Sequence, residues 1–282
     1  MALGIAVAAL LATVVVVANR GGTQRAALPR GTGSASLVSV DAAAEWRAST
    51  AEWAVRELDR SRTVACDQPM CRELARRGTP AGALLPIGGP EAILQSDVVI
   101  VTAQVRGALG AQLKPLLAPD VLARFGTGAS RFEVREVAPG GTAVYKARQA
   151  ADRADRRYAG RKLLGNARLG VTPDVARELS AGHVDGRLLT VIALLTAQHR
   201  LYLRSFGDAG HTPGVPLRSV DIATLDGRTP AAAAVTGVDL LLHGQETLFR
   251  PAATTTPHPP EGGPPVLRIR FGAPSPTGLL TP

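Results

Sequence analysis

Aromatic residues make up only 4% of this 282-residue chain, and lysine and cysteine are scarcer still. Three lysines stand among 32 basic residues, and the only two cysteines lie five positions apart. Proteins that bind nucleic acid commonly stack bases on aromatic side chains between their cations, so a formal charge of +9 gives little support for such a partner. A zinc site would need more ligands than two cysteines. We expect no nucleic-acid partner and no cofactor.

Enzyme signatures are missing as well. The sequence contains no G-x-S-x-G elbow, no S-x-x-K, no H-E-x-x-H and no P-loop. Ser205, Asp208 and His211 lie too close together in sequence to be credited as a catalytic triad. We predict no catalytic residue, and a protein that binds or scaffolds is favoured over an enzyme.

Residues 2–18, ALGIAVAALLATVVVVA, form one unbroken apolar run. As a helix the run would cover about 25 Å, against about 30 Å for the hydrocarbon core of a bilayer. A signal peptide and a single membrane anchor both fit, although no basic residue precedes the run. Arg20, Arg25 and Arg30 follow it, and the charge-bias rule alone would then keep the C-terminal side in the cytoplasm.

We nevertheless expect an extracytoplasmic body, either held at the cell membrane by a single pass or secreted, because the cysteine pair described below suits an oxidising space. The preference for arginine over lysine is typical of a GC-rich genome, such as those of actinobacteria. Partners of an exported basic surface would be the membrane itself, through the N-terminal segment, and an envelope protein or anionic lipid headgroups and wall polymers.

Composition and patterning divide the chain into five parts. They are a signal or anchor (1–18), a flexible linker (19–37), an α/β module (38–138), a connecting helix (139–165) and an α+β module (166–282) with a Pro-rich loop (251–265). This is the expected fold class: a short, mostly parallel sheet with helices, followed by an α+β unit.

Strand and helix signals alternate in the first module, which argues for an α/β layer. Asp41 is the expected N-cap of a helix that runs to Arg60 and turns Trp46 and Trp53 inward. The pattern further predicts buried strands at 63–66, 84–87 and 97–102, a helix at 105–117, and a hairpin of 121–125 with 132–137, whose second strand alternates like a half-solvated edge strand.

Cys66 and Cys71 flank the start of a short helix predicted to end at Gly78. With Asp67 as N-cap, the cysteines occupy the two positions whose side chains meet in a hydrophobic staple. A disulfide there would be worth about 2 kcal/mol through loop entropy. Free buried thiols and redox or metal chemistry are the alternatives, although a C-x4-C spacing departs from the C-x-x-C of redox sites.

The pieces of the first module follow a recognisable order: Trp53 in a helix, VACD ending at Asp67, a short helix ending at Gly78, SDVVIVT, and RFGTGASRFEVREV. In this order residues 41–138 resemble the soluble C-terminal domain of actinobacterial membrane mannosyltransferases of the dolichol-phosphate-mannose type. Catalysis in those enzymes belongs to their multi-spanning portion. The resemblance implies an extracytoplasmic accessory domain without glycosyl transfer.

The connecting helix is predicted over 142–164, with one apolar stripe made of Val144, Ala147, Ala151, Ala154 and Tyr158. Asp152 stands four positions from both Arg148 and Arg156, which favours ion pairs on a solvated face. Docking on anionic lipid or on a partner is the alternative interpretation.

In the second module we expect a helix after Thr172, a helix and strand before a Gly/Pro-rich loop, and a helix over 230–248 that breaks at Gly237. The Pro-rich loop 251–265 should be mobile, and the alternating residues 266–271 should return as a sheet strand.

Residues 185–227 are similar in layout to actinobacterial relatives of the zinc D-alanyl-D-alanine carboxypeptidase family. There a loop histidine and an aspartate seven residues later bind zinc. Asp221 matches the aspartate, but Gly214 stands where the histidine belongs, and His211 comes three residues earlier. We expect a scaffold without metal, in which Asp221 makes structural hydrogen bonds. A rebuilt metal site drawn from Asp208, His211, Asp221 and His243 is the alternative.

Taken together, the patterns predict a non-catalytic extracytoplasmic envelope protein with a binding or scaffolding role. A cell-wall peptidase-like hydrolase with an altered zinc site is the first alternative. An accessory partner of lipid-linked glycosyltransferases is the second.

Overall fold

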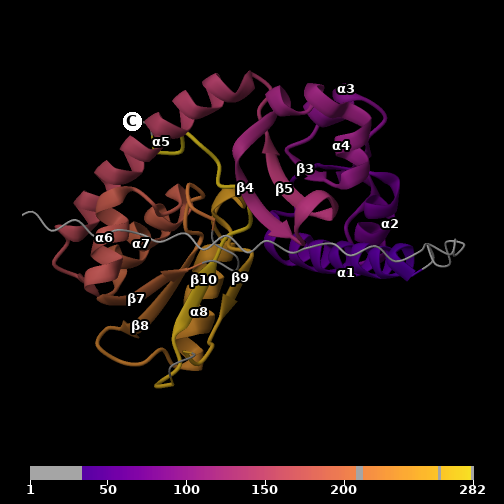
Figure 1. Ribbon diagram of the computed structural model, residues 1–282. Coiled ribbons are helices and arrows are strands. Elements are labelled where there is room, and N and C mark those ends of the chain that lie inside the picture. Colours follow the sequence, from indigo (N-terminus) through magenta and orange to yellow (C-terminus); the bar gives the residue numbers. More distant parts are fainter. Residues whose placement is uncertain (1–33, 208–211, 260–261, 281–282) are drawn as a thin grey trace, which may run out of the picture.

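Two five-stranded mixed sheets, each with its own helices, make up the computed structural model, which describes residues 34–207, 212–259 and 262–280. Figure 1 shows them side by side, with the long helix α5 (Gly141–Leu164) running across the top from one to the other. The first sheet has the order β2-β1-β3-β5-β4 and the second the order β6-β7-β8-β10-β9. The expectation of helices combined with sheets in both halves is met at this coarse level.

The first sheet is parallel on one side and antiparallel on the other, because β1 pairs in parallel with β2 and β3, and a hairpin then closes the sheet. Its strands are β1 (Val64–Cys66), β2 (Leu84–Pro86), β3 (Val98–Val101), β4 (Leu117–Phe125) and β5 (Phe132–Val137). One face packs against α1 (Ser34–Glu57) and α2 (Gln68–Arg76), and the other against α3 (Pro90–Leu94) and α4 (Ala103–Leu109).

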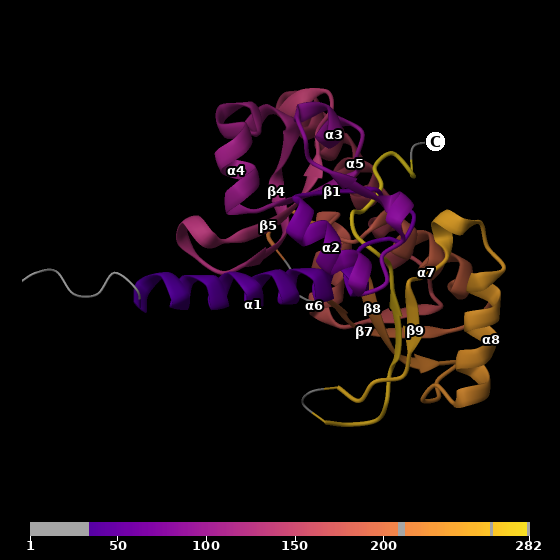
Figure 2. The ribbon, with the colours of Figure 1, turned by 90° about the vertical axis from the view of Figure 1, so that its right-hand side faces the viewer.

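The sequence prediction for α1 is wrong at its start. The helix begins at Ser34, seven residues before the expected N-cap Asp41, and therefore takes in the end of the segment assigned to a linker. It ends at Glu57 and projects beyond the sheet towards the N-terminus (Figure 2). Trp53 is buried as predicted, whereas Trp46 is only half-buried, because it lies nearer the projecting end of the helix.

The hairpin that closes the first sheet is confirmed, but its second strand is not an edge. β5 lies between β3 and β4, and β4 forms the edge. The expected helix over 105–117 is also shorter, because α4 stops at Leu109 where Gly110 takes a positive φ, and two 3-10 turns, η2 (Gly110–Gln112) and η3 (Lys114–Leu116), follow. The two 3-10 turns line a cavity together with residues of β4 and β5.

The second sheet begins with a parallel pair and continues antiparallel, and one hydrophobic cluster joins it to the end of α5 and to three further helices. The strands are β6 (Leu169–Val171), β7 (Leu201–Gly207), β8 (Ser219–Leu225), β9 (Ala253–Thr255) and β10 (Leu267–Arg270). The helices are α6 (Pro173–Ala181), α7 (Gly186–Gln198) and α8 (Ala232–His243). A last 3-10 turn, η5 (Thr247–Phe249), follows α8.

Two predictions for this part need correction and one is confirmed. α8 continues through Gly237 without a break and ends at His243. The Pro-rich loop is not wholly irregular, because β9 forms inside it and pairs with β10. The alternating segment after the loop does return to the sheet, as β10 between β8 and β9.

Helix α5 has the predicted length, but it turns its polar face, and not its apolar stripe, towards the rest of the protein. Its apolar stripe is exposed from end to end, with Val144 at 50% and Tyr158 at 63% exposure, while Asp152 and Arg156 are each 4% exposed. The stripe consists largely of alanine, so it offers little area to bury. The opposite face carries Gly160, which lets the backbone of α6 approach closely. The predicted ion pair between Asp152 and Arg156 exists, but it is buried.

The C-terminal segment ties the two halves together. After β10 the chain returns to the end of α1, where Ala273 donates to Glu57 O at 2.6 Å and accepts from Asp59 N at 2.8 Å. Further along, Gly278 N donates to Asp152 of α5 at 2.9 Å. Within the described residues no helix is both long and apolar enough to cross a membrane. The apolar run at 1–18 lies outside them.

Candidate functional site

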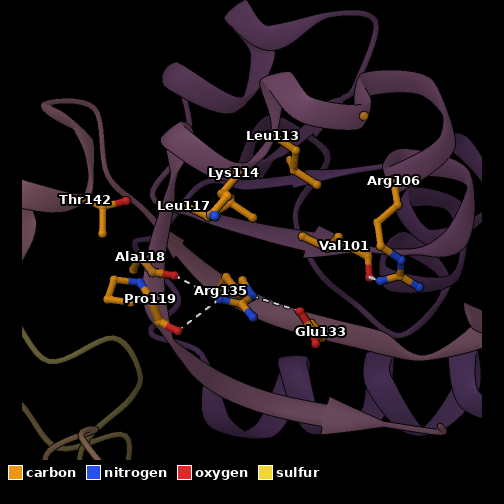
Figure 3. Close-up of a pocket in the computed structure, with 11 residues that line it drawn as sticks. Val101, Arg106, Leu113, Lys114, Leu117, Ala118, Pro119, Glu133, Arg135 and Thr142 are labelled. Carbon is orange, nitrogen blue, oxygen red and sulfur yellow. Dashed lines mark hydrogen bonds and ion pairs between the residues drawn. The ribbon is translucent and has the colours of Figure 1, made fainter. Parts of the chain in front are cut away.

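A cavity of about 490 Å³ opens on the first sheet, between α4 with its two 3-10 turns, strands β4 and β5, and the start of α5 (Figure 3). Apolar side chains from β3, from β4 and from the residue between η2 and η3 line its wall: Val101, Leu117 and Leu113. Charged groups also line it: Arg106, Lys114, Glu133 and Arg135. We call this the α4/β5 pocket.

Glu133 and Arg135 reach this pocket because they lie two residues apart on β5 and so share one face of the sheet. Glu133 is only 4% exposed, and three guanidinium groups surround it. The Nε atoms of Arg131, Arg135 and Arg124 lie 2.8, 2.9 and 3.3 Å from its carboxylate. Burial alone would raise the pKa of Glu133, but the hydrogen bonds from Arg131 and Arg135 outweigh burial, and its pKa lies below the usual value. The carboxylate is thus charged at neutral pH.

Arg106 is held in place by main-chain oxygens. Its Nη1 donates to Val101 O at 3.2 Å, and its Nη2 donates to Ala129 O at 2.8 Å and to Arg131 O at 2.5 Å. None of these acceptors carries a full charge. Burial and the nearby Arg131 lower the pKa of Arg106, and the attraction of Glu133 offsets this only in part.

Lys114 is exposed on η3 at the mouth of the pocket, and among the described residues it makes no hydrogen bond or ion pair. The pocket lining therefore carries three cations against a single carboxylate, and that carboxylate is already shared with Arg131 and Arg124. Preorganised cations beside an apolar wall suit a ligand with a negative head and an apolar portion.

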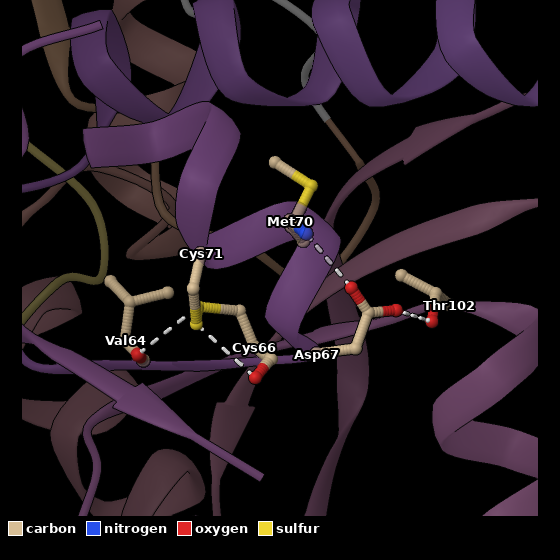
Figure 4. The surroundings of a disulfide bond; sticks show 6 residues. All are labelled: Val64, Cys66, Asp67, Met70, Cys71 and Thr102. Carbon is tan, nitrogen blue, oxygen red and sulfur yellow. Dashed lines mark hydrogen bonds between the residues drawn. A yellow bond between two sulfur atoms is a disulfide. The ribbon is translucent and has the colours of Figure 1, made fainter. Parts of the chain in front are cut away.

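The disulfide belongs to the same sheet, at the point where β1 leads into α2 (Figure 4). Cys66 and Cys71 are bonded, with Cα atoms 5.4 Å apart and side chains 0% and 7% exposed. The predicted N-cap is confirmed, because Asp67 accepts from Met70 N at 2.9 Å. Both sulfurs are buried, whereas reactive cysteines are partly exposed.

Asp67 also accepts a hydrogen bond from Thr102, which caps α4 just after β3. β1 and β3 are adjacent parallel strands at the point where the strand order reverses, and doubly wound sheets bind ligands beyond the carboxyl ends of such strands. Here Asp67 and Thr102 occupy that position. They bind each other, and they accept from the first turns of α2 and α4. The cavity has formed one strand further along, beside Val101.

Two of the four candidate metal ligands, Asp208 and His211, lie outside the described residues. Asp221 on β8 accepts two hydrogen bonds from Arg268 on β10, Nε to Oδ1 at 2.6 Å and Nη2 to Oδ2 at 2.8 Å. Ser205 donates to the same carboxylate at 3.2 Å. His243 donates from Nδ1 to Asp239 O at 2.9 Å. Within the described parts of the chain, no three His, Cys, Asp or Glu side chains are grouped to hold a metal.

Sequence reasoning missed the α4/β5 pocket. One signal is the alternation in FEVREV, which by itself predicts a half-solvated edge strand. A second signal was the run of arginines around Glu133 at 124, 131 and 135. Neither reveals a cavity, because the cavity depends on where α4 stops.

No family model, curated protein or solved structure matches this chain.

Proposed function

We propose that this chain is a non-catalytic extracytoplasmic protein of the cell envelope, and that it binds a ligand with an anionic head and an apolar portion in the α4/β5 pocket. The observation that carries the proposal is the imbalance of charge in a pocket with apolar walls. Arg106, Lys114 and Arg135 face a single carboxylate, Glu133. An anion would complete the balance, and the wall formed by Val101, Leu113 and Leu117 would bury the apolar portion.

The extracytoplasmic placement is supported by two independent features. The apolar run at 2–18 has the composition of a signal peptide or anchor. The Cys66–Cys71 disulfide is the form expected in an oxidising compartment. N-terminal sequencing of the native protein, with protease added to intact cells, tests both anchoring and exposure. An intact chain that is protected from protease would contradict the placement.

Binding is tested by calorimetric titration of the purified protein with decanoate, below the concentration at which it forms micelles. Decyltrimethylammonium, which has the same chain length and the opposite charge, is the matched control ligand. We expect saturable 1:1 binding of decanoate and none of the cation.

The matched variants are Lys114→Glu, which reverses the charge at the mouth of the pocket, and Lys162→Glu, which reverses a charge on the exposed face of α5. Lys114→Glu should weaken decanoate binding at least tenfold, and Lys162→Glu should leave it within twofold. Equal binding of both surfactants, or equal weakening by both variants, would show that the pocket is not an anion site.

A further inference from the structure

A second cavity, of about 320 Å³, lies at the junction of the two halves and shares no lining residue with the α4/β5 pocket. It is bounded by α5, by the end of α6 and by the segment 213–216. This segment also reaches the first half: Val215 packs in the core shared by α1 and the first sheet, and Gly214 lies against Asp120 of β4.

Arg156 of α5 lines this cavity, although the residue is only 4% exposed. Its Nη1 lies 3.2 Å from Oδ2 of Asp152. Among the described residues neither Nε nor Nη2 donates a hydrogen bond, and Nε is a buried atom without a partner. Oδ2 of Asp152 is likewise a buried atom without a hydrogen-bond partner, and a buried polar group left unpaired costs about 1–3 kcal/mol. A guanidinium presents coplanar N–H groups, and a carboxylate can pair with two of them through both of its oxygens.

Asp152 holds Arg156 through Oδ2 and accepts from Gly278 N at 2.9 Å through Oδ1. Burial lowers the pKa of Arg156 and raises the pKa of Asp152. Both charged side chains are therefore poorly solvated, and the attraction between them does not offset the cost of removing them from water. Asp185 also attracts Arg156, and a ligand carboxylate in the cavity would add to the attraction that Asp152 and Asp185 supply.

Arg153, one turn before Arg156, brings a second guanidinium to the cavity. It donates to His183 Nε2, so the other ring nitrogen, Nδ1, carries the proton and donates to Glu178 at 2.7 Å. Through these contacts Glu178 is engaged with His183, and Arg153 donates to His183 and to Ala181 O, neither of which is a carboxylate. Glu178 also lines the cavity, and its charge disfavours a ligand with several negative charges.

We propose that the cavity is a binding site for a small organic monocarboxylate, held by the guanidinium groups of Arg156 and Arg153, which both line it. The ligand is compact, because the cavity is about two thirds the volume of the α4/β5 pocket. The cavity lies between α5, the end of α6 and the segment 213–216. An occupant therefore contacts both helices and the segment that reaches the first half.

The probe is sodium propionate, titrated against the full chain and followed by thermal unfolding and by calorimetry, with sodium chloride at equal ionic strength and neutral propionamide as controls. Ligand that binds only the folded state raises Tm by mass action. We expect propionate to raise Tm above both controls and to bind at one site. A rise equal to that in chloride, or no rise at all, would overturn the proposal.

Three variants locate the site. Arg156→Lys keeps a positive charge for Asp152 but removes the planar edge, and should weaken propionate binding at least tenfold. Arg153→Gln changes an exposed residue, so it keeps the test valid even where Arg156→Lys unfolds, and it should weaken binding several-fold. Arg161→Gln removes an exposed arginine about two turns after Arg153 on α5, and it should leave propionate binding unchanged. Loss of binding in Arg161→Gln, or full binding in Arg153→Gln, would contradict the assignment.

Discussion

Arg187 on α7 crosses the boundary between the two halves to Asp59, just after α1, with Nη1 3.5 Å from Oδ2. The same guanidinium binds Asp185 at 2.7 Å and Gly272 O at 2.7 Å, and lies 4.9 Å from the centre of the Phe271 ring. Arg187 and Asp185 are 1% and 0% exposed. One buried cation therefore joins α7, the C-terminal segment and the end of α1.

Arg187→Met should destabilise the fold by about 3–5 kcal/mol, because it leaves the buried carboxylate of Asp185 without its cation. At present Arg187 outweighs burial and keeps the pKa of Asp185 below its usual value. Urea unfolding measures the change. Arg177→Met, which removes an exposed partner of Asp174, is the control and should stay within about 0.5 kcal/mol. A small effect at Arg187 would mean that water reaches the cluster.

The disulfide should contribute about 2 kcal/mol, because it closes a loop of only six residues in the unfolded chain. The double variant Cys66→Ala/Cys71→Ala should lose this amount in denaturant unfolding. Mass measurement after thiol blocking, without reductant, gives the redox state of the native protein. Two blocked thiols in that measurement would show that the pair is reduced in its own compartment.

Glu136→Gln should flatten the dependence of stability on pH. Burial raises the pKa of Glu136, and Tyr145 donates to its carboxylate at 2.7 Å, with Arg62, Asp97 and Arg148 as the other charges that act on it. An acid with a raised folded-state pKa is protonated in the native state at a pH where the unfolded chain has already lost the proton. Stability therefore falls as pH rises from the unfolded pKa, about 4.3, to the folded value, with a slope of up to about 1.4 kcal/mol per pH unit.

Glutamine keeps an acceptor for Tyr145 and carries no charge, so the variant should match the parent near pH 4 and exceed it at pH 7. Unfolding free energies across this range provide the measurement. Glu246→Gln, at an exposed position, is the control and should leave the profile unchanged. A variant less stable than the parent at pH 7 would show that the carboxylate is stabilising.

Gly160→Ala should destabilise the contact between α5 and α6 by about 1–3 kcal/mol, because an added Cβ would lie 2.2 Å from Leu179 O. Gly237→Ala is the matched control within α8, where a Cβ meets nothing within 4 Å. That change should stabilise the protein by about 0.5–1 kcal/mol. Thermal unfolding separates the two, and equal effects would mean that α5 and α6 pack less closely.

Asp221→Asn should lower stability by about 1 kcal/mol through the loss of the charged two-point contact with Arg268. Since this contact is structural, a chelator such as EDTA should leave the Tm of the parent chain unchanged. A Tm that falls with chelator and recovers with zinc, in the parent but not in Asp221→Asn, would favour the altered zinc site instead.

Local structure could be predicted where neighbouring residues determine it. The run from Val64 to Gly78 predicts a strand, a capped helix and a left-handed stop, and the structure has all three, with Gly78 at φ 97°. The N-cap and the left-handed glycine after the helix act within a few residues and need no partner from a distant segment. The hairpin of β4 with β5 was predictable for the same reason. The return of β10 was predictable from the alternation of residues 266–271, although its partner β8 is distant in sequence.

The site could not be predicted in this way, because it depends on which element covers which. FEVREV fixes that Glu133 and Arg135 share a face, but only the position of β5 inside the sheet decides that Glu133 is buried. The pattern of α5 likewise fixes a helix, yet its alanine stripe is exposed and Asp152 and Arg156 are buried. Sequence by itself determined the local elements through short-range sterics and capping. The tertiary structure alone decided the buried charges and cavities, because burial depends on the area offered by distant parts of the chain.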